Sequence, residues 1–191
     1  MLYSLNGQYP TEIPFRIVLS DGRTRTDPST FTEQEIADAG YIVVPEPPTK
    51  GPYQRLLWDG TVWSLEETRT LEEAILIKLN ELSTLRKSKE LDFTFNGVKL
   101  VLNEQTQARI NGAVTGFAYR PNDIISWEVS RGIFVDFNKV AMEALGTAAW
   151  EHIRECYVIV KSITQKVKAC TSLAEVDLIN LETEWQNGSI T

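Results

Sequence analysis

The stretch AAWEHIRECYVIVKSITQKVKAC, residues 148–170, decides the fold, because its apolar residues follow one strict spacing. They alternate steps of four and three, which is a period of about 3.5 residues held over three heptads. This spacing predicts a long amphipathic helix that begins near Asn138. We call the apolar positions the heptad seam: Ala149, Ile153, Cys156, Val160, Ile163, Val167 and Cys170.

The heptad seam has two candidate partners, and the sequence leaves both open. A helix with this period packs either against another helix of its own chain or against further copies of itself in a coiled coil. The a positions Ile153, Val160 and Val167 are all β-branched, which leaves dimers and trimers open. A homo-oligomer, trimer or dimer, is therefore one alternative, and pairing within the chain is the other.

Upstream of the seam, the pattern predicts a second long helix from about Ser64 to Lys89. Between the two helices, Asn96-Gly97 and Ser130-Arg131-Gly132 mark turns between runs of strand-forming residues. NEQTQARINGAV, residues 103–114, has the pattern of a helix with Asn103 as its N-cap. The sequence therefore predicts a ββαββ unit flanked by two long helices.

The first 46 residues predict a small β-rich module. IPFRIVLS, residues 13–20, has the alternation of a half-buried strand, and Asp21-Gly22 after it is a hairpin turn signal. Thr32 and Glu35 have the spacing of a capping box, which predicts a short helix over residues 33–39.

A Pro-rich stretch, residues 45–52, separates this module from a predicted hairpin whose turn is Asp59-Gly60. Trp58 and Trp63 flank the turn, where they either pack on each other or form an aromatic binding platform. The whole pattern predicts an α+β fold with three segments. They are an N-terminal docking module (1–46), a linker with a hairpin (47–66) and a helix-and-hairpin domain (67–191).

Composition excludes several classes of partner. The net charge is −7, and acidic proteins are repelled by nucleic acid and by anionic membranes. No apolar run approaches the roughly 18 residues of a membrane span, so we expect no membrane insertion. The first residues lack a basic region followed by an apolar stretch, so we expect synthesis in the cytoplasm without a signal peptide.

The residues that usually carry chemistry are sparse. His152 is the one histidine, and it has no Ser or Cys partner at a plausible nucleophile position. Cys156 and Cys170 lie about 21 Å apart along a helix, too far for a disulfide, and with one histidine they cannot complete a zinc site. We therefore predict no catalytic residues, no metal site and no cofactor, and no enzyme activity.

The region from about Phe93 to Trp185 resembles a domain of unknown function found in tail-fibre and tail-fibre-assembly proteins of tailed bacteriophages. The resemblance rests on FTFNGVKLVLNEQTQARINGAV, ISWEVSRGIFVDFNKVAMEAL, AWEHIRECYVIVKSI and SLAEVDLINLETEW, in that order. The opening segment, with SDGRTRTDPSTFT, and the hairpin QRLLWDGTVWSLEE resemble modules of the same proteins.

This resemblance implies a structural component of a phage tail fibre, or of the connection between fibre and baseplate, that acts as a non-catalytic adaptor in the virion. Its implied partners are other tail-fibre or baseplate proteins. The alternatives are a tail-fibre assembly chaperone and a host-receptor-binding tip protein. For partner docking the sequence favours Phe15 and Ile17, with Trp58 and Trp63 second; the heptad seam is the candidate for self-association.

Overall fold

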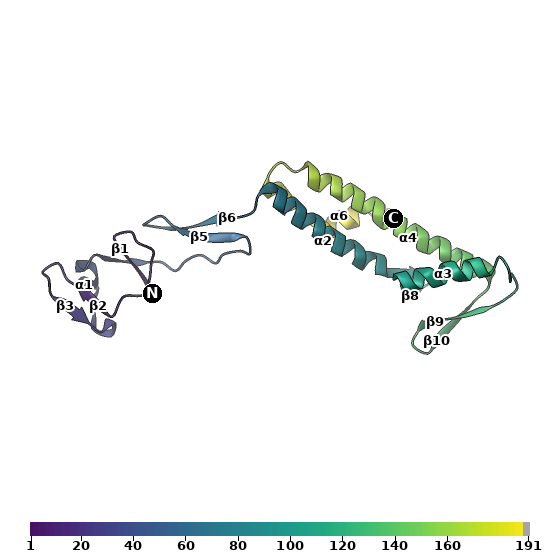
Figure 1. Cartoon of the computed structure of the whole chain (residues 1–191), viewed down its shortest axis with the longest axis horizontal. Helices are drawn as coiled ribbons and strands as arrows, with labels where there is room; N and C mark the ends of the chain where they lie inside the picture. The colour runs from purple at the N-terminus through teal and green to yellow at the C-terminus, as the bar shows by residue number, and fades with distance from the viewer. Residues whose placement is uncertain (189–191) are drawn as a thin grey trace. The chain divides into compact units, whose positions relative to one another are not determined.

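The computed structural model describes residues 1–188 and combines helices with small antiparallel hairpins (Figure 1). The predicted α+β class is confirmed. The chain divides into two compact units, Met1–Arg69 and a second unit that starts at Thr70. Residues 47–66, predicted as a separate linker and hairpin, belong to the first unit, and the division lies close to the predicted boundary at 66/67.

The first unit is built from short strands that pair two at a time. Its elements are β1 (Leu2–Leu5), β2 (Arg16–Val18), β3 (Thr24–Thr26), the 3-10 helix η1 (Pro28–Thr30), α1 (Glu33–Asp38), β4 (Tyr41–Val44), β5 (Gln54–Trp58) and β6 (Trp63–Glu67). β1 pairs with β4, β2 with β3 and β5 with β6, all antiparallel. Along the sequence, the β2–β3 hairpin and α1 lie between the paired strands β1 and β4.

Local signals account for the elements of the first unit. The predicted capping box is present, because the Thr32 side chain accepts from the Glu35 backbone and the Glu35 carboxylate accepts from the Thr32 backbone. Gly40, with φ of +85°, ends α1 in the left-handed conformation that glycine adopts without strain. A small core lies beneath these elements and consists of Ile17, Leu19, Ile36 and Val44.

The second unit contains the long helices. Its elements are α2 (Leu71–Leu91), β7 (Asp92–Phe95), β8 (Val98–Val101), α3 (Glu104–Gly116), β9 (Ile125–Ser130), β10 (Ile133–Phe137), α4 (Lys139–Ala169), α5 (Leu173–Leu178) and α6 (Leu181–Gly188). β7 pairs with β8 and β9 with β10, and α3 lies between the two hairpins in sequence. The predicted ββαββ unit between two long helices is therefore what the structure shows.

Turn and cap chemistry explains why these boundaries were predictable. Asn96 and Gly97 both have positive φ, 49° and 79°, as a two-residue hairpin turn of this kind requires. The side chain of Asn103 accepts from the Thr106 backbone at the start of α3. The side chain of Asn138 does the same for Ala141 at the start of α4.

One predicted boundary is wrong. The helix expected from Ser64 begins at Leu71, because Ser64 lies in β6 and pairs with Leu57 of β5. The physical start signal is Thr70, whose side chain accepts from the Glu73 backbone while the Glu73 carboxylate accepts from the Thr70 backbone. This second capping box was overlooked in the sequence pattern.

The core of the second unit has two clusters along α4, which lies beside α2 (Figure 1). In the first cluster, the hairpins and α3 pack on the first half of α4; its buried residues are Phe93, Leu100, Leu102, Ile110, Phe117, Phe137, Met142, Leu145 and Ala149. In the second, α2 and α6 pack on the second half; its buried residues are Leu82, Cys156, Ile159, Ile163, Val167 and Trp185.

Candidate functional site

The heptad seam lies in the interior of one chain. Ala149, Cys156, Ile163 and Val167 are buried, and Val160 is partly buried against the cluster that includes Leu82 and Trp185. Ile153 packs against the hairpin cluster, and Cys170 is the partly exposed C-cap of α4. Within the chain, the start of the seam packs on the hairpins and α3, and the part from Cys156 to Val167 packs on α2 and α6.

Of the two residues favoured first for docking, one is exposed in the structure and the other is buried. Phe15 directly precedes β2 and leaves 69% of its surface exposed, whereas Ile17 in the same segment is 1% exposed. Strand alternation does not explain this difference, because residues two apart on a strand share a face. Phe15 lies before the first residue of β2, Arg16, and Ile17 lies within the strand, where it packs into the core. Phe15 is therefore available to a partner, and Ile17 belongs to the core of the first unit.

Trp58 and Trp63 form a packed pair. Their ring centroids lie 5.1 Å apart across the β5–β6 hairpin, and Tyr9 meets Trp63 edge-on at 5.2 Å. The Trp58 indole donates to the Gly7 carbonyl at 3.1 Å, and the Trp63 indole donates to the Pro45 carbonyl at 3.0 Å. Of the two interpretations left open, packing describes the pair, which ties the hairpin to the start of the chain.

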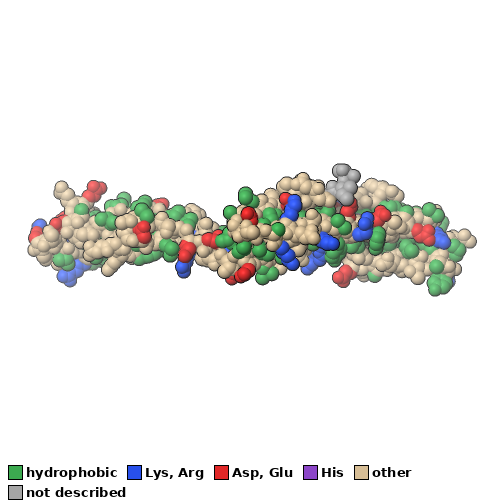
Figure 2. Space-filling view, turned by 90° about the horizontal axis from the view of Figure 1, so that it is seen from above, with side chains coloured by type: hydrophobic (Ala, Val, Ile, Leu, Met, Phe, Trp, Pro, Cys, Tyr) green, Lys and Arg blue, Asp and Glu red, His purple; other side chains and the backbone are tan. Residues whose placement is uncertain are grey.

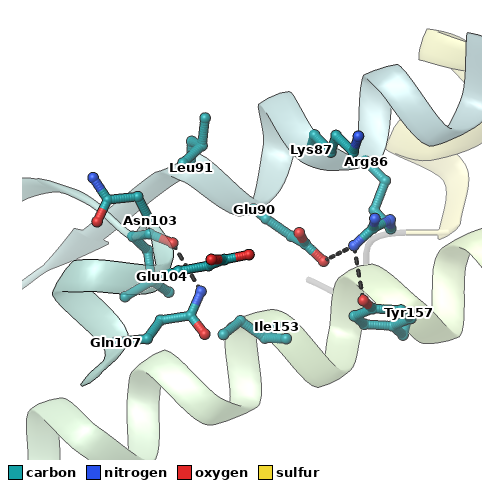
Figure 3. A pocket seen from close by; sticks show the side chains of 10 residues that line it. Arg86, Lys87, Glu90, Leu91, Asn103, Glu104, Gln107, Ile153 and Tyr157 are labelled. Carbon is teal, nitrogen blue, oxygen red and sulfur yellow. Dashed lines mark hydrogen bonds and ion pairs between the residues drawn. The ribbon is translucent and has the colours of Figure 1, made fainter. Parts of the chain in front are cut away.

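The second unit has an open cleft of about 430 Å³, which we call the Arg86 cleft (Figure 3). The end of α2, the start of α3 and the middle of α4 line it. Arg86 donates from Nη1 to Glu90 at 2.5 Å and to the Tyr157 hydroxyl at 2.8 Å, and its guanidinium lies 4.8 Å from the Tyr157 ring centroid. This network joins α2 to α4 across 71 positions of sequence.

The polar groups of the Arg86 cleft balance in charge. Lys87 and Glu104 add one charge of each sign to the Arg86–Glu90 pair, and Glu104 points into the cleft in Figure 3. The Gln107 amide donates to the Leu102 carbonyl at 3.0 Å, so it closes the start of α3. The cleft offers donors and acceptors to a polar ligand and holds no nucleophile paired with a base.

A separate apolar cavity of about 220 Å³ lies between the two hairpins of this unit. Its walls are mostly aliphatic and aromatic side chains that complete the first core cluster: Phe95, Val98, Leu100, Val129, Val135, Phe137 and Ala141, with Asn96 and Asp136 also lining it. A cavity with such walls suits an apolar side chain better than a polar ligand.

Comparison with protein families matches residues 73–180 to the model described as Domain of unknown function (DUF4376). That match covers more than half of the 191-residue chain. The chain belongs to the DUF4376 family. Comparison with curated proteins and with solved structures gave no match. The matched residues lie within the second unit, so the DUF4376 domain contains α2 from residue 73 onward, α4, both hairpins and the Arg86 cleft.

Two titratable side chains in the core of the DUF4376 domain, His152 and Cys156, have surroundings that suit a structural role. His152 Nε2 lies 3.1 Å from the Lys89 carbonyl, and its ring lies 5.2 Å from that of Phe93. Burial, reinforced by nearby carboxylates, raises the pKa of the Cys156 thiol to about 11, so the thiol stays protonated at neutral pH. A protonated, buried thiol is a poor nucleophile.

Within residues 1–188, no group of three or more His, Cys, Asp or Glu side chains is placed to hold a metal ion. The helices of this described part also include none that is long and apolar enough to cross a bilayer.

Two features of the DUF4376 domain were missed in the sequence. The Arg86–Tyr157 contact joins residues far apart in the chain, and no local pattern signals it. Trp150 is 63% exposed on α4, with the Arg154 guanidinium 5.5 Å from its ring. A second alternation of three and four residues, running outside the heptad seam, was the signal that could have found Trp150.

Proposed function

We propose that this protein is a structural component of a tailed-phage tail fibre, or of the connection between fibre and baseplate, acting as a non-catalytic adaptor. In this proposal the first unit docks on a tail protein and the DUF4376 domain assembles or carries the next component. The sequence resemblance to tail-fibre and tail-fibre-assembly proteins supports a place in a phage tail. The surface of the first unit supports the role of an adaptor that docks on another protein.

The observation that carries the proposal is the imbalance between buried and exposed apolar residues in the first unit. Within residues 1–69, all of which the structure describes, four hydrophobic side chains are buried. Many more large ones are exposed, by 37% or more: Met1, Tyr9, Phe15, Val18, Ile42, Val43, Tyr53, Leu57, Val62 and Leu65. Figure 2 shows hydrophobic side chains on the surface of the first unit. A small unit with so much exposed apolar surface gains stability when a partner covers it.

Strand β4 offers the most specific docking geometry. It pairs with β1, and among the described residues no strand pairs with its other edge. Ile42 and Val43 are 50% and 58% exposed, and as consecutive strand residues they point to opposite faces. An edge strand with apolar side chains on both faces is suited to β-augmentation, in which a partner contributes the next strand.

The test is to quantify this chain in purified virions against the tube or sheath protein by mass spectrometry. A fixed copy number in small multiples of three or six supports the proposed structural role. Absence from virions together with abundance in the infected-cell lysate would instead identify an assembly chaperone. Binding of purified protein to host surface polysaccharide would favour the receptor-binding alternative.

A further inference from the structure

Helix α4 carries a second regular stripe on its solvent side, which we call the outer stripe. Its six residues are all exposed and are spaced by alternating steps of three and four: Val140, Glu143, Thr147, Trp150, Arg154 and Tyr157. Val140, Trp150 and Tyr157 are 74%, 63% and 54% exposed. The heptad seam occupies another face of the same helix. The outer stripe combines apolar with polar residues; Val140 and Trp150 are mostly uncovered, and Tyr157 is partly exposed although it also contacts Arg86.

The outer stripe is complementary to itself when reversed. Each of its residues has a counterpart at the same distance on the other side of the midpoint between Ala148 and Ala149. Two copies of α4 that cross antiparallel at this point therefore place Val140 opposite Tyr157, Glu143 opposite Arg154 and Thr147 opposite Trp150. Such a self-complementary patch is what a two-fold, isologous interface requires.

A groove beside Trp150 provides the space for this packing. Its volume is about 320 Å³, and it is lined by Asn111 and Val114 of α3 and by Glu143, Gly146, Thr147 and Trp150 of α4. A Cβ atom on Gly146 would lie 3.1 Å from Val114 Cγ2, so glycine permits the close approach of α3 to α4 here. In the antiparallel arrangement the partner's Trp150 lies over Thr147, at the mouth of this groove.

The charges of the outer stripe favour a second copy of this chain as its partner. Arg154 has no carboxylate partner within residues 1–188, and its guanidinium rests beside Trp150. Glu143 has one ion pair among the described residues, with Lys139 at 3.8 Å, and the two side chains are 49% and 42% exposed. An antiparallel second copy brings Glu143 to Arg154 twice, once on each side of the axis. A parallel trimer through the same stripe would instead gather like charges at Arg154.

We propose that the outer stripe is a homodimer surface on which two copies of this chain pack α4 antiparallel across a two-fold axis, with Trp150 at its centre. Trp and Arg at the centre of an interface are the residue types that most often dominate binding. This inference does not depend on the phage role, because it concerns the chain with itself.

The experiment measures the mass of the full-length chain in solution by sedimentation equilibrium over a range of concentrations. The wild-type chain is expected to be dimeric. Trp150→Ala should weaken self-association at least about thirtyfold. Leu76→Ala is the matched control, because Leu76 is 60% exposed on α2 and lies outside the outer stripe. It should leave the dimer unchanged, and circular dichroism should show native helicity in both variants.

Charge reversal tests the antiparallel register. Glu143→Arg and Arg154→Glu should each weaken the dimer about tenfold, since each replaces two attractive contacts by two repulsive ones. The double variant should recover the affinity of the wild type. A wild-type chain that is monomeric or trimeric would overturn the proposal, as would a dimer insensitive to Trp150→Ala or a double variant weaker than either single one.

Discussion

Replacing Ile163 by alanine tests whether the heptad seam stabilises the chain from within. Ile163 is 2% exposed in the cluster formed by α2, α4 and α6. Loss of its methyl and methylene groups costs about 2.4 kcal/mol at about 0.8 kcal/mol per group. The cavity left beside Leu82 and Val167 raises the expected loss to about 3–4 kcal/mol.

The assay is urea unfolding followed by circular dichroism at 222 nm, which reports mainly on α2 and α4. It is best done in the Trp150→Ala background, where we expect a monomer and a midpoint independent of protein concentration. Val158→Ala is the control on the same helix: Val158 is 52% exposed, so the free energy of unfolding should change by about 0.5 kcal/mol or less. The reasoning is refuted if Ile163→Ala lowers the oligomeric mass of the otherwise wild-type chain without lowering its free energy of unfolding.

Three further outcomes follow from local chemistry. Thr70→Ala removes one half of the capping box, so it should lower the free energy of unfolding of the second unit by about 1 kcal/mol in the same assay. Thr70→Ser should restore most of this loss. Cys170 should react with a thiol reagent at pH 8 in the folded chain, while Cys156, buried and with its pKa raised to about 11, should react only after denaturation. Hydrogen bonds from Arg69 lower the pKa of Glu67 from 4.5 to about 2, so its stabilising contribution is present above pH 4.5 and is lost as the pH falls toward 2. Glu67→Gln should therefore flatten the acid side of the thermal stability profile of the first unit, measured by tryptophan fluorescence; an unchanged profile would contradict this cause.

Features set by neighbouring residues were predictable from the sequence. The Asn96-Gly97 turn and the caps at Asn103 and Asn138 depend on backbone conformations and hydrogen bonds within a few residues, so their sequence signals are complete. The predicted start of α2 was wrong because Glu66 and Glu67 resemble the acidic first turn of a helix, whereas both residues lie in β6. Strand pairing with β5 decided that boundary.

Features that depend on distant contacts were not predictable in the same way. A 3.5-residue period indicates that one face of a helix is buried, but it does not indicate which helix covers that face. The heptad seam therefore left open both packing within the chain and self-association. The Arg86–Tyr157 contact and the opposite burial of Phe15 and Ile17 likewise follow from tertiary packing. The spacing of the outer stripe could be seen in the sequence of α4. It was not predicted because three of its six residues are polar, whereas the heptad seam is apolar throughout.

Incorporation into virions tests most directly whether the first unit docks through its exposed apolar residues. Val43→Ser and Val101→Ser make a matched pair, because both residues lie in strands and are 58% and 57% exposed, but Val101 belongs to the DUF4376 domain. Copy number per virion, measured by mass spectrometry, should fall about tenfold for Val43→Ser under limiting expression and stay at the wild-type level for Val101→Ser. Equal incorporation of both variants at the wild-type level would contradict docking through β4.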